Sequence, residues 1–144
     1  MKPQDQDIIN IKIKEIEYSV ELIRSRIPQT FEEFLKLDEL VRDGIYKRVE
    51  FIIQNILDIL AIFTKYLKTI PGDDDEIIEI LIRANLIDEE TGKKVRQMKA
   101  FRNLLVHRYG KIFHELAYKN IIEGFGDIYN VLEMIRKIRD KLDP

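Results

Sequence analysis

The spacing of the apolar residues constrains the fold of this chain more than any other feature of its sequence. Between residues 7 and 27 they recur in helical steps of three and four, at Ile9, Ile13, Ile16, Val20, Ile23 and Ile27. A second stripe, from Ile45 to Leu67, predicts a long helix that starts near Gly44. A third, over about 114–141, comprises Leu116, Ile122, Phe125, Ile128, Leu132, Ile135 and Ile138. The chain is therefore expected to be all-α.

Residues that end or cap helices divide these stripes. Pro28 should end the first helix and Pro71-Gly72 the long one, because proline disfavours helical geometry in the residue before it. A capping-box pattern predicts a short helix over about 30–41, and Asp73 can cap another. One more helix is expected over about 88–106.

The composition fits one folded domain, because 45% apolar and 35% charged residues in a chain of 144 can form a core. Without cysteine, the sequence excludes disulfides, zinc–thiolate sites and cysteine nucleophiles. No apolar run approaches the roughly 18 residues of a membrane span, and the polar, acidic start is unlike a signal peptide. We expect a single domain over residues 1–144, an antiparallel four-helix-type bundle with additional short helices, in the cytoplasm.

The formal net charge of −2 hides a local basic segment. From residue 93 to residue 111 the chain has no acidic residue, and its basic residues there are Lys93, Lys94, Arg96, Lys99, Arg102, Arg108 and Lys111. Such a segment on an acidic protein indicates a local anionic ligand. The alternative interpretation is a solvated helix face that carries cations.

Arg102, Asn103, His107 and Tyr109 gather where the helix expected over 88–106 ends. Asn103 and His107 are four residues apart and share a helix face, and the long Arg102 side chain can swing to the same side. The set suits phosphodiester chemistry, because arginine binds phosphate by two hydrogen bonds and histidine can take a proton from an RNA 2′-hydroxyl. No metal is needed if that 2′-oxygen is the nucleophile. The spacing alone also fits a helix-end histidine bonded to backbone, with Arg102 in a surface ion pair.

The segment Arg102–Tyr109 resembles the Arg-x4-His-x-Tyr motif of HepT-like toxins, which are small ribonucleases of the HEPN superfamily. The resemblance also covers Lys47–Asn55, Asn85–Asp88 and Lys99–Phe101, and in order and spacing it spans about residues 8–138. HepT-like toxins are all-α and typically dimeric, with the two motifs meeting in a cleft across the dimer. They are usually encoded beside an MntA-like minimal nucleotidyltransferase, the antitoxin. The resemblance thus implies a HEPN-like bundle, a homodimer and that partner.

By this resemblance Arg102 and His107 would be catalytic in a metal-independent endoribonuclease that needs no cofactor. Asn103 would support the site, and Tyr109 would accept AMP from the antitoxin. In the expected reaction His107 takes the 2′-hydroxyl proton, and Arg102 stabilises charge in the transition state. The cations expected to bind the RNA substrate are Lys99, Arg96 and Arg108.

Two other functions stay open from the sequence. One is a non-catalytic HEPN module that binds a nucleotide or serves as the partner subunit of a minimal nucleotidyltransferase. The other is a helical interaction module in which the motif is incidental.

The remaining polar and aromatic residues give weaker signals. His114 is expected to have no catalytic role. Residues 73–76 are expected to be a capped helix start rather than a cation site. The tyrosines expected in the core or at its edge are Tyr18, Tyr46, Tyr66, Tyr118 and Tyr129.

Overall fold

The computed structural model describes residues 1–106 and 110–143, with only the backbone described at 110–112. Over these residues the chain forms helices and no strand, which confirms the expected all-α class. The helices are α1 (Pro3–Arg26), α2 (Phe31–Leu35), α3 (Glu39–Lys65), α4 (Asp74–Arg83), α5 (Glu89–Leu104) and α6 (Gly110–Leu142). None of the helices so described has an apolar stretch long enough to cross a membrane.

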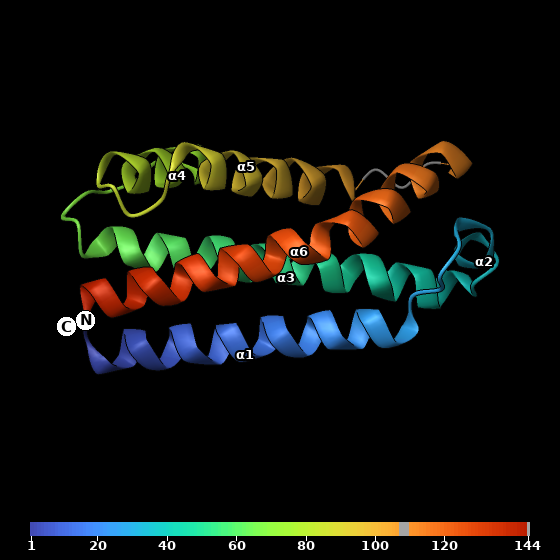
Figure 1. Ribbon diagram of the computed structural model, residues 1–144, viewed down its shortest axis with the longest axis horizontal. Helices are drawn as coiled ribbons and strands as arrows, with labels where there is room; N and C mark the ends of the chain where they lie inside the picture. Colours follow the sequence, from blue (N-terminus) through green and yellow to red (C-terminus); the bar gives the residue numbers. More distant parts are fainter. Residues whose placement is uncertain (107–109, 144) are drawn as a thin grey trace.

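The long helices α1, α3, α5 and α6 run in alternating directions along one axis, as an antiparallel bundle (Figure 1). The central helix is α3, which packs against α1, α4, α5 and α6. Helices α4 and α5 lie together on the side of α3 away from α1 (Figure 1). At one end of the bundle α2 contacts α6. At the other end the two chain termini meet, and the Met1 ammonium lies 3.3 Å from Asp143 Oδ1.

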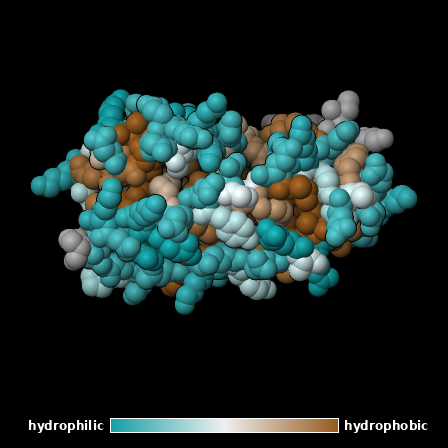
Figure 2. Space-filling view, viewed as in Figure 1, coloured by the Kyte–Doolittle hydropathy of each residue, from teal (hydrophilic) through white to brown (hydrophobic). Residues whose placement is uncertain are grey.

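The core is built from the predicted apolar stripes of α1 and α3. On α1 the stripe is buried at Ile9, Ile13, Ile16, Val20 and Ile23. It packs against α3, whose fully buried residues include Ile52, Ile56, Ile59, Leu60 and Phe63. Burial of this apolar surface is the main favourable contribution to folding. Hydrophilic residues cover most of the outer face in Figure 2, with apolar patches between them.

The stripe predicted for the last helix is wrong at its start. Leu116 is 45% exposed and Ile122 is 40% exposed. The inward residues there are Phe113, Ala117 and Ile121, which are spaced by four. The reason is that α6 begins at Gly110, earlier than about 114, and its first turns pack on aromatic side chains near α2; the ring centroids of Phe113 and Tyr46 are 5.6 Å apart.

The expectation that all five tyrosines lie in or near the core is also wrong for two of them. Tyr18 is 61% exposed and Tyr129 is 42% exposed. Tyr46 is fully buried, whereas Tyr66 and Tyr118 are partly buried. Each of these three has its hydroxyl within hydrogen-bonding distance of another residue, which satisfies a polar group that burial would otherwise penalise.

Side-chain caps set the helix boundaries near α2. The Thr30 hydroxyl accepts the Glu33 N–H at 3.2 Å, which confirms Thr30 as the N-cap of α2. The helix after it ends at Leu35 rather than near residue 41, because Asp38 caps a new helix by accepting the Leu40 N–H at 2.9 Å. Helix α3 therefore begins before the expected start near residue 44.

Candidate active site

A tight turn places α5, which carries Arg102 and Asn103 of the predicted motif, against α4. Asn85 has a φ of 59°, in the left-handed region that asparagine tolerates better than most residues. Asp88 then caps α5 by accepting the Thr91 N–H at 2.7 Å, and this bond lowers the pKa of Asp88. Gly92 permits the close approach of the two helices, because a Cβ there would lie 2.8 Å from Ile82 Cδ1. The turn thus fixes which side chains of α5 face α4.

Arg102, in the last turn of α5, is held by acceptors from three helices. Its Nη1 donates to Gln54 Oε1 on α3 at 2.8 Å, and its Nη2 donates to Asp74 Oδ2 on α4 at 3.4 Å. Asn103 Oδ1, beside it on α5, accepts from Arg102 Nε at 3.4 Å and from Nη2 at 3.2 Å. The Arg102 side chain keeps 20% of its surface exposed. The guanidinium is therefore oriented by the fold and still reachable from solvent.

The two other cations predicted on this face of α5 also contact α4. Arg96 Nη2 lies 3.0 Å from Glu79 Oε2, and Lys99 Nζ lies 2.8 Å from Asp75 Oδ2. The hydrogen bond from Lys99 lowers the pKa of the Asp75 carboxyl. Asp74, Asp75 and Glu79 are called the α4 carboxylates below. They pair with three of the cations of the basic segment and balance part of its charge.

The structure brings together only part of the predicted site. Arg102 and Asn103 are adjacent and hydrogen-bonded to each other. The predicted base His107, the predicted AMP acceptor Tyr109 and the predicted RNA contact Arg108 lie outside the described residues.

His114 lies on α6 against α3, and its contacts among the described residues include those with Tyr46 and Phe113. Its Nδ1 is 2.7 Å from the hydroxyl oxygen of Tyr46, and the two rings are stacked with centroids 5.8 Å apart. Burial lowers the pKa of His114, with the positive charge of Arg42 as a second cause. These contacts describe a packed histidine that ties the start of α6 to α3.

Sequence reasoning missed Gln54 and Asp74 as neighbours of Arg102. Gln54 is a single amide on a long helix, and no motif surrounds it. Asp74 belongs to the segment 73–76, which was interpreted as a helix start, and that interpretation is confirmed. Asp73 Oδ1 accepts the Glu76 N–H at 2.9 Å, and Glu76 Oε2 accepts the Gly72 N–H at 2.8 Å. In the part of the chain that the structure describes, no group of acidic residues and histidines is arranged to hold a metal ion.

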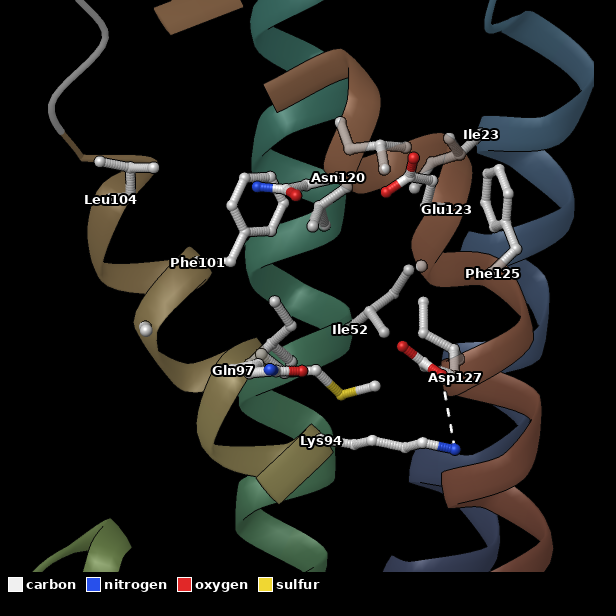
Figure 3. Close-up of a pocket in the computed structure, with 17 residues that line it drawn as sticks. Ile23, Ile52, Lys94, Gln97, Phe101, Leu104, Asn120, Glu123, Phe125 and Asp127 are labelled. Carbon is white, nitrogen blue, oxygen red and sulfur yellow. Dashed lines mark ion pairs between the residues drawn. The ribbon is translucent and has the colours of Figure 1, made fainter. Parts of the chain in front are cut away.

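A cleft of about 590 Å³ opens between α3, α5 and α6. Figure 3 shows Phe101 and Gln97 of α5 on one side of this cleft and Asn120 and Glu123 of α6 on the other. Most of its walls are apolar. Lys94 of α5 pairs across it with Asp127 of α6 at 3.6 Å. Arg102 is not among the residues that line the cleft, so the α5 face that meets α4 and the face that lines this cleft are separate.

Solved structures share this fold. A tri-AMPylated Shewanella oneidensis HEPN toxin in complex with an MNT antitoxin matches with a TM-score of 0.78 and 20% identity, over 90% of this chain and 97% of that one. YutE of Bacillus subtilis, a cytosolic protein of unknown function, matches with a TM-score of 0.70 and 20% identity, over 96% of this chain and 91% of that one. The bundle is therefore HEPN-like, as expected.

Sequence comparison adds the family. A protein of Archaeoglobus fulgidus named "Putative RNase" is 26% identical over 132 residues, which are 92% of this chain and 96% of that protein. A family model described as Ribonuclease HepT-like matches residues 16–135 and so includes Arg102, Asn103 and the segment that follows them. Because the match covers most of the sequence, the chain belongs to the Ribonuclease HepT-like family.

Proposed function

We propose that this protein is a metal-independent endoribonuclease and the toxin of a toxin–antitoxin pair. The observation that carries the proposal is Arg102, an oriented but accessible guanidinium at the end of α5, in a chain of the Ribonuclease HepT-like family. It stands at the first position of an Arg-x4-His-x-Tyr sequence, with His107 and Tyr109 at the others. This combination supplies a phosphate-binding cation and a base that titrates near neutral pH.

In the proposed reaction His107 takes the proton of an RNA 2′-hydroxyl. The 2′-oxygen then forms a bond to the adjacent phosphorus, the bond from phosphorus to the 5′-oxygen breaks, and that oxygen takes up a proton. The products are a 2′,3′-cyclic phosphate and a 5′-hydroxyl. Arg102 stabilises the negative charge that grows on the phosphoryl oxygens, and Asn103 supports the arginine.

In this proposal an RNA phosphate reaches Arg102 by displacing Asp74, the α4 carboxylate that contacts it. The contact from Arg102 Nη2 to Asp74 Oδ2 is long, at 3.4 Å, and ion pairs between partly exposed side chains contribute little stability. An RNA phosphate can take the place of Asp74 while Gln54 and Asn103 keep their bonds to the guanidinium. Lys99, Arg96 and Arg108 bind neighbouring phosphates, so binding weakens steeply as salt is added.

Regulation in this proposal acts at Tyr109. The likeness to a toxin that is AMPylated and bound to an MNT antitoxin supports an MntA-like nucleotidyltransferase as the partner. That enzyme would transfer AMP from ATP to the tyrosine hydroxyl and release pyrophosphate. Each AMP adds a bulky anionic phosphodiester close in sequence to Arg102, where it competes with the RNA backbone.

Co-expression with the neighbouring nucleotidyltransferase should give AMP-sized mass increments on Tyr109, and Tyr109→Phe should escape them. An adduct on another tyrosine would refute this assignment.

The active form is proposed to be a homodimer. The end of α5 offers few walls for a groove, and a twofold axis would place two copies of the motif around one groove wide enough for single-stranded RNA. Light scattering at micromolar concentration should give twice the chain mass. A monomer that retains full activity would remove the composite groove from the proposal.

The test of the chemistry compares histidine and arginine variants in matched pairs. Arg102→Ala and His107→Ala should each reduce RNA cleavage by about 10²-fold or more in the presence of EDTA. His114→Gln, which changes the other histidine, and Arg136→Ala, which removes an ion-paired arginine on α6, should leave cleavage near the parental rate. Parental cleavage by His107→Ala, or complete loss of activity in EDTA, would refute the mechanism. Binding of RNA or nucleotide without cleavage would favour a non-catalytic module.

A further inference from the structure

We infer that Gln54 is a positioning residue for Arg102, and this inference rests on the proposed function. Gln54 lies on α3, far from the motif in the sequence, yet its Oε1 accepts the shortest hydrogen bond that Arg102 makes among the described residues, at 2.8 Å. The other acceptors, Asp74 and Asn103, lie at 3.2–3.4 Å. Gln54 is thus the firmest link between the guanidinium and the body of the bundle.

The orientation of the Gln54 amide is fixed by its two neighbours. Its Nε2 donates to Asp58 Oδ1 at 2.8 Å, one helical turn further along α3. An ionised carboxylate can only accept a hydrogen bond, and a guanidinium can only donate one. The amide nitrogen must therefore face Asp58 and the carbonyl oxygen must face Arg102. The reverse orientation would break both bonds.

A second contact anchors this pair to α1. Lys12 Nζ of α1 donates to Asp58 Oδ2 at 3.2 Å and to Asn55 Oδ1 at 3.1 Å. Asn55 is buried, with 5% of its surface exposed. The hydrogen bonds therefore run from α1 through Asp58 and Gln54 to Arg102 on α5. Three helices of the bundle contribute to where the guanidinium lies.

The neutrality of Gln54 distinguishes its role from that of Asp74. A carboxylate beside Arg102 repels a phosphate and must be displaced when RNA binds. The Gln54 carbonyl adds no charge, so it can stay bound while the phosphate takes the remaining donors. Arg102 has five N–H groups, and the described contacts use four of them. With Asp74 displaced, the arginine keeps a fixed orientation and offers two donors to the phosphate.

The test replaces Gln54 by methionine, which has a similar shape and no acceptor oxygen. Since only orientation is lost, kcat for RNA cleavage should fall roughly tenfold while KM changes less than about twofold. Asp58→Asn should have a smaller effect of the same kind, because an asparagine amide no longer fixes the Gln54 amide in one orientation. The matched control is Gln97→Met, which removes an amide from α5 that makes no hydrogen bond within the described residues.

A second measurement uses NMR to follow the rotation of the Arg102 guanidinium itself. In ¹⁵N-labelled parental protein the Arg102 guanidinium should rotate slowly and give separate Nη signals, assigned by comparison with Arg102→Lys. In Gln54→Met these signals should merge, and in Gln97→Met they should not. This readout does not depend on RNA, and circular dichroism confirms that each variant is folded.

The outcomes separate this inference from the proposed function. If Arg102→Ala loses cleavage while Gln54→Met keeps the parental kcat and separate Nη signals, the positioning role is wrong and the proposed function stands. If Gln54→Met raises KM instead of lowering kcat, Gln54 contacts RNA rather than positioning Arg102, and the inference also fails. If Arg102→Ala cleaves RNA at the parental rate, the proposed function fails and the inference fails with it.

Discussion

The α4 carboxylates should limit RNA affinity, and neutralising two of them should increase it. The double variant Asp75→Asn with Glu79→Gln keeps the shapes of both side chains and removes the carboxylates that lie 2.8 Å from Lys99 and 3.0 Å from Arg96. Each of these pairs joins partly exposed side chains, so each should change an equilibrium by a factor of about 1.5 to 5. Together they give a gain in affinity of about 2-fold to 25-fold. In this prediction the freed cations would bind phosphate without first leaving a carboxylate.

The assay is fluorescence anisotropy with a labelled 2′-O-methyl oligoribonucleotide, which cannot be cleaved because it lacks the attacking 2′-hydroxyl. The control is Glu15→Gln with Glu21→Gln on α1, which makes the same change in net charge on exposed residues away from α4. At about 150 mM salt the screening length is about 8 Å, so the control should bind like the parent. Unchanged or weaker binding by the α4 variant, or equal gains in both variants, would show that Arg96 and Lys99 do not contact RNA.

Two further predictions concern stability. Tyr118→Phe removes the hydroxyl that donates to the Pro28 carbonyl at 2.7 Å, so unfolding in urea should become easier by about 1 kcal/mol, and unchanged stability would show that the bond contributes nothing. Stability should also fall in two stages on acidification. Burial lowers the pKa of His114, so the unfolded chain takes up a proton more readily and stability declines below about pH 6.5. The Tyr66 hydrogen bond lowers the pKa of Asp5, so its contribution is lost below about pH 4. Urea titrations at several pH values test both stages, and a His114→Phe variant that still loses stability between pH 6.5 and 5 would contradict the first.

The helices could be predicted because each carries a local signal. The isoleucine stripe of α1 and the capping residues Thr30 and Asp73 depend on neighbours within one or two turns of the same segment. The start of α6 could not be placed in this way. The face of α6 that turns inward there depends on the contact between Phe113 and Tyr46 of α3. The spacing of apolar residues along α6 alone cannot predict a contact with another helix.

The candidate site shows the same division between local and spatial information. Arg102 and Asn103 are neighbours in the chain, so the sequence could place both at one helix end, but their hydrogen bond appears only in the structure. The sequence shows the positive charge of the basic segment, but not the α4 carboxylates that pair with it, because these belong to another helix. The bond from Gln54 to Arg102 joins residues 48 positions apart and requires α3 and α5 to be packed first.

Because the first and last described residues lie side by side, the order of the helices along the chain can be changed by circular permutation. The Met1 ammonium and Asp143 are already paired, at the end of the bundle away from α2 and the first turns of α6 (Figure 1). A short linker between them would close a loop with little loss of entropy. New ends could then open between α3 and α4 beside Ile70, which is 94% exposed. Such a circular permutant would keep α4, α5 and α6 in one uninterrupted stretch. The original ends would become an internal linker, and the new ends would lie between α3 and α4, so that Arg102 on α5 is unchanged.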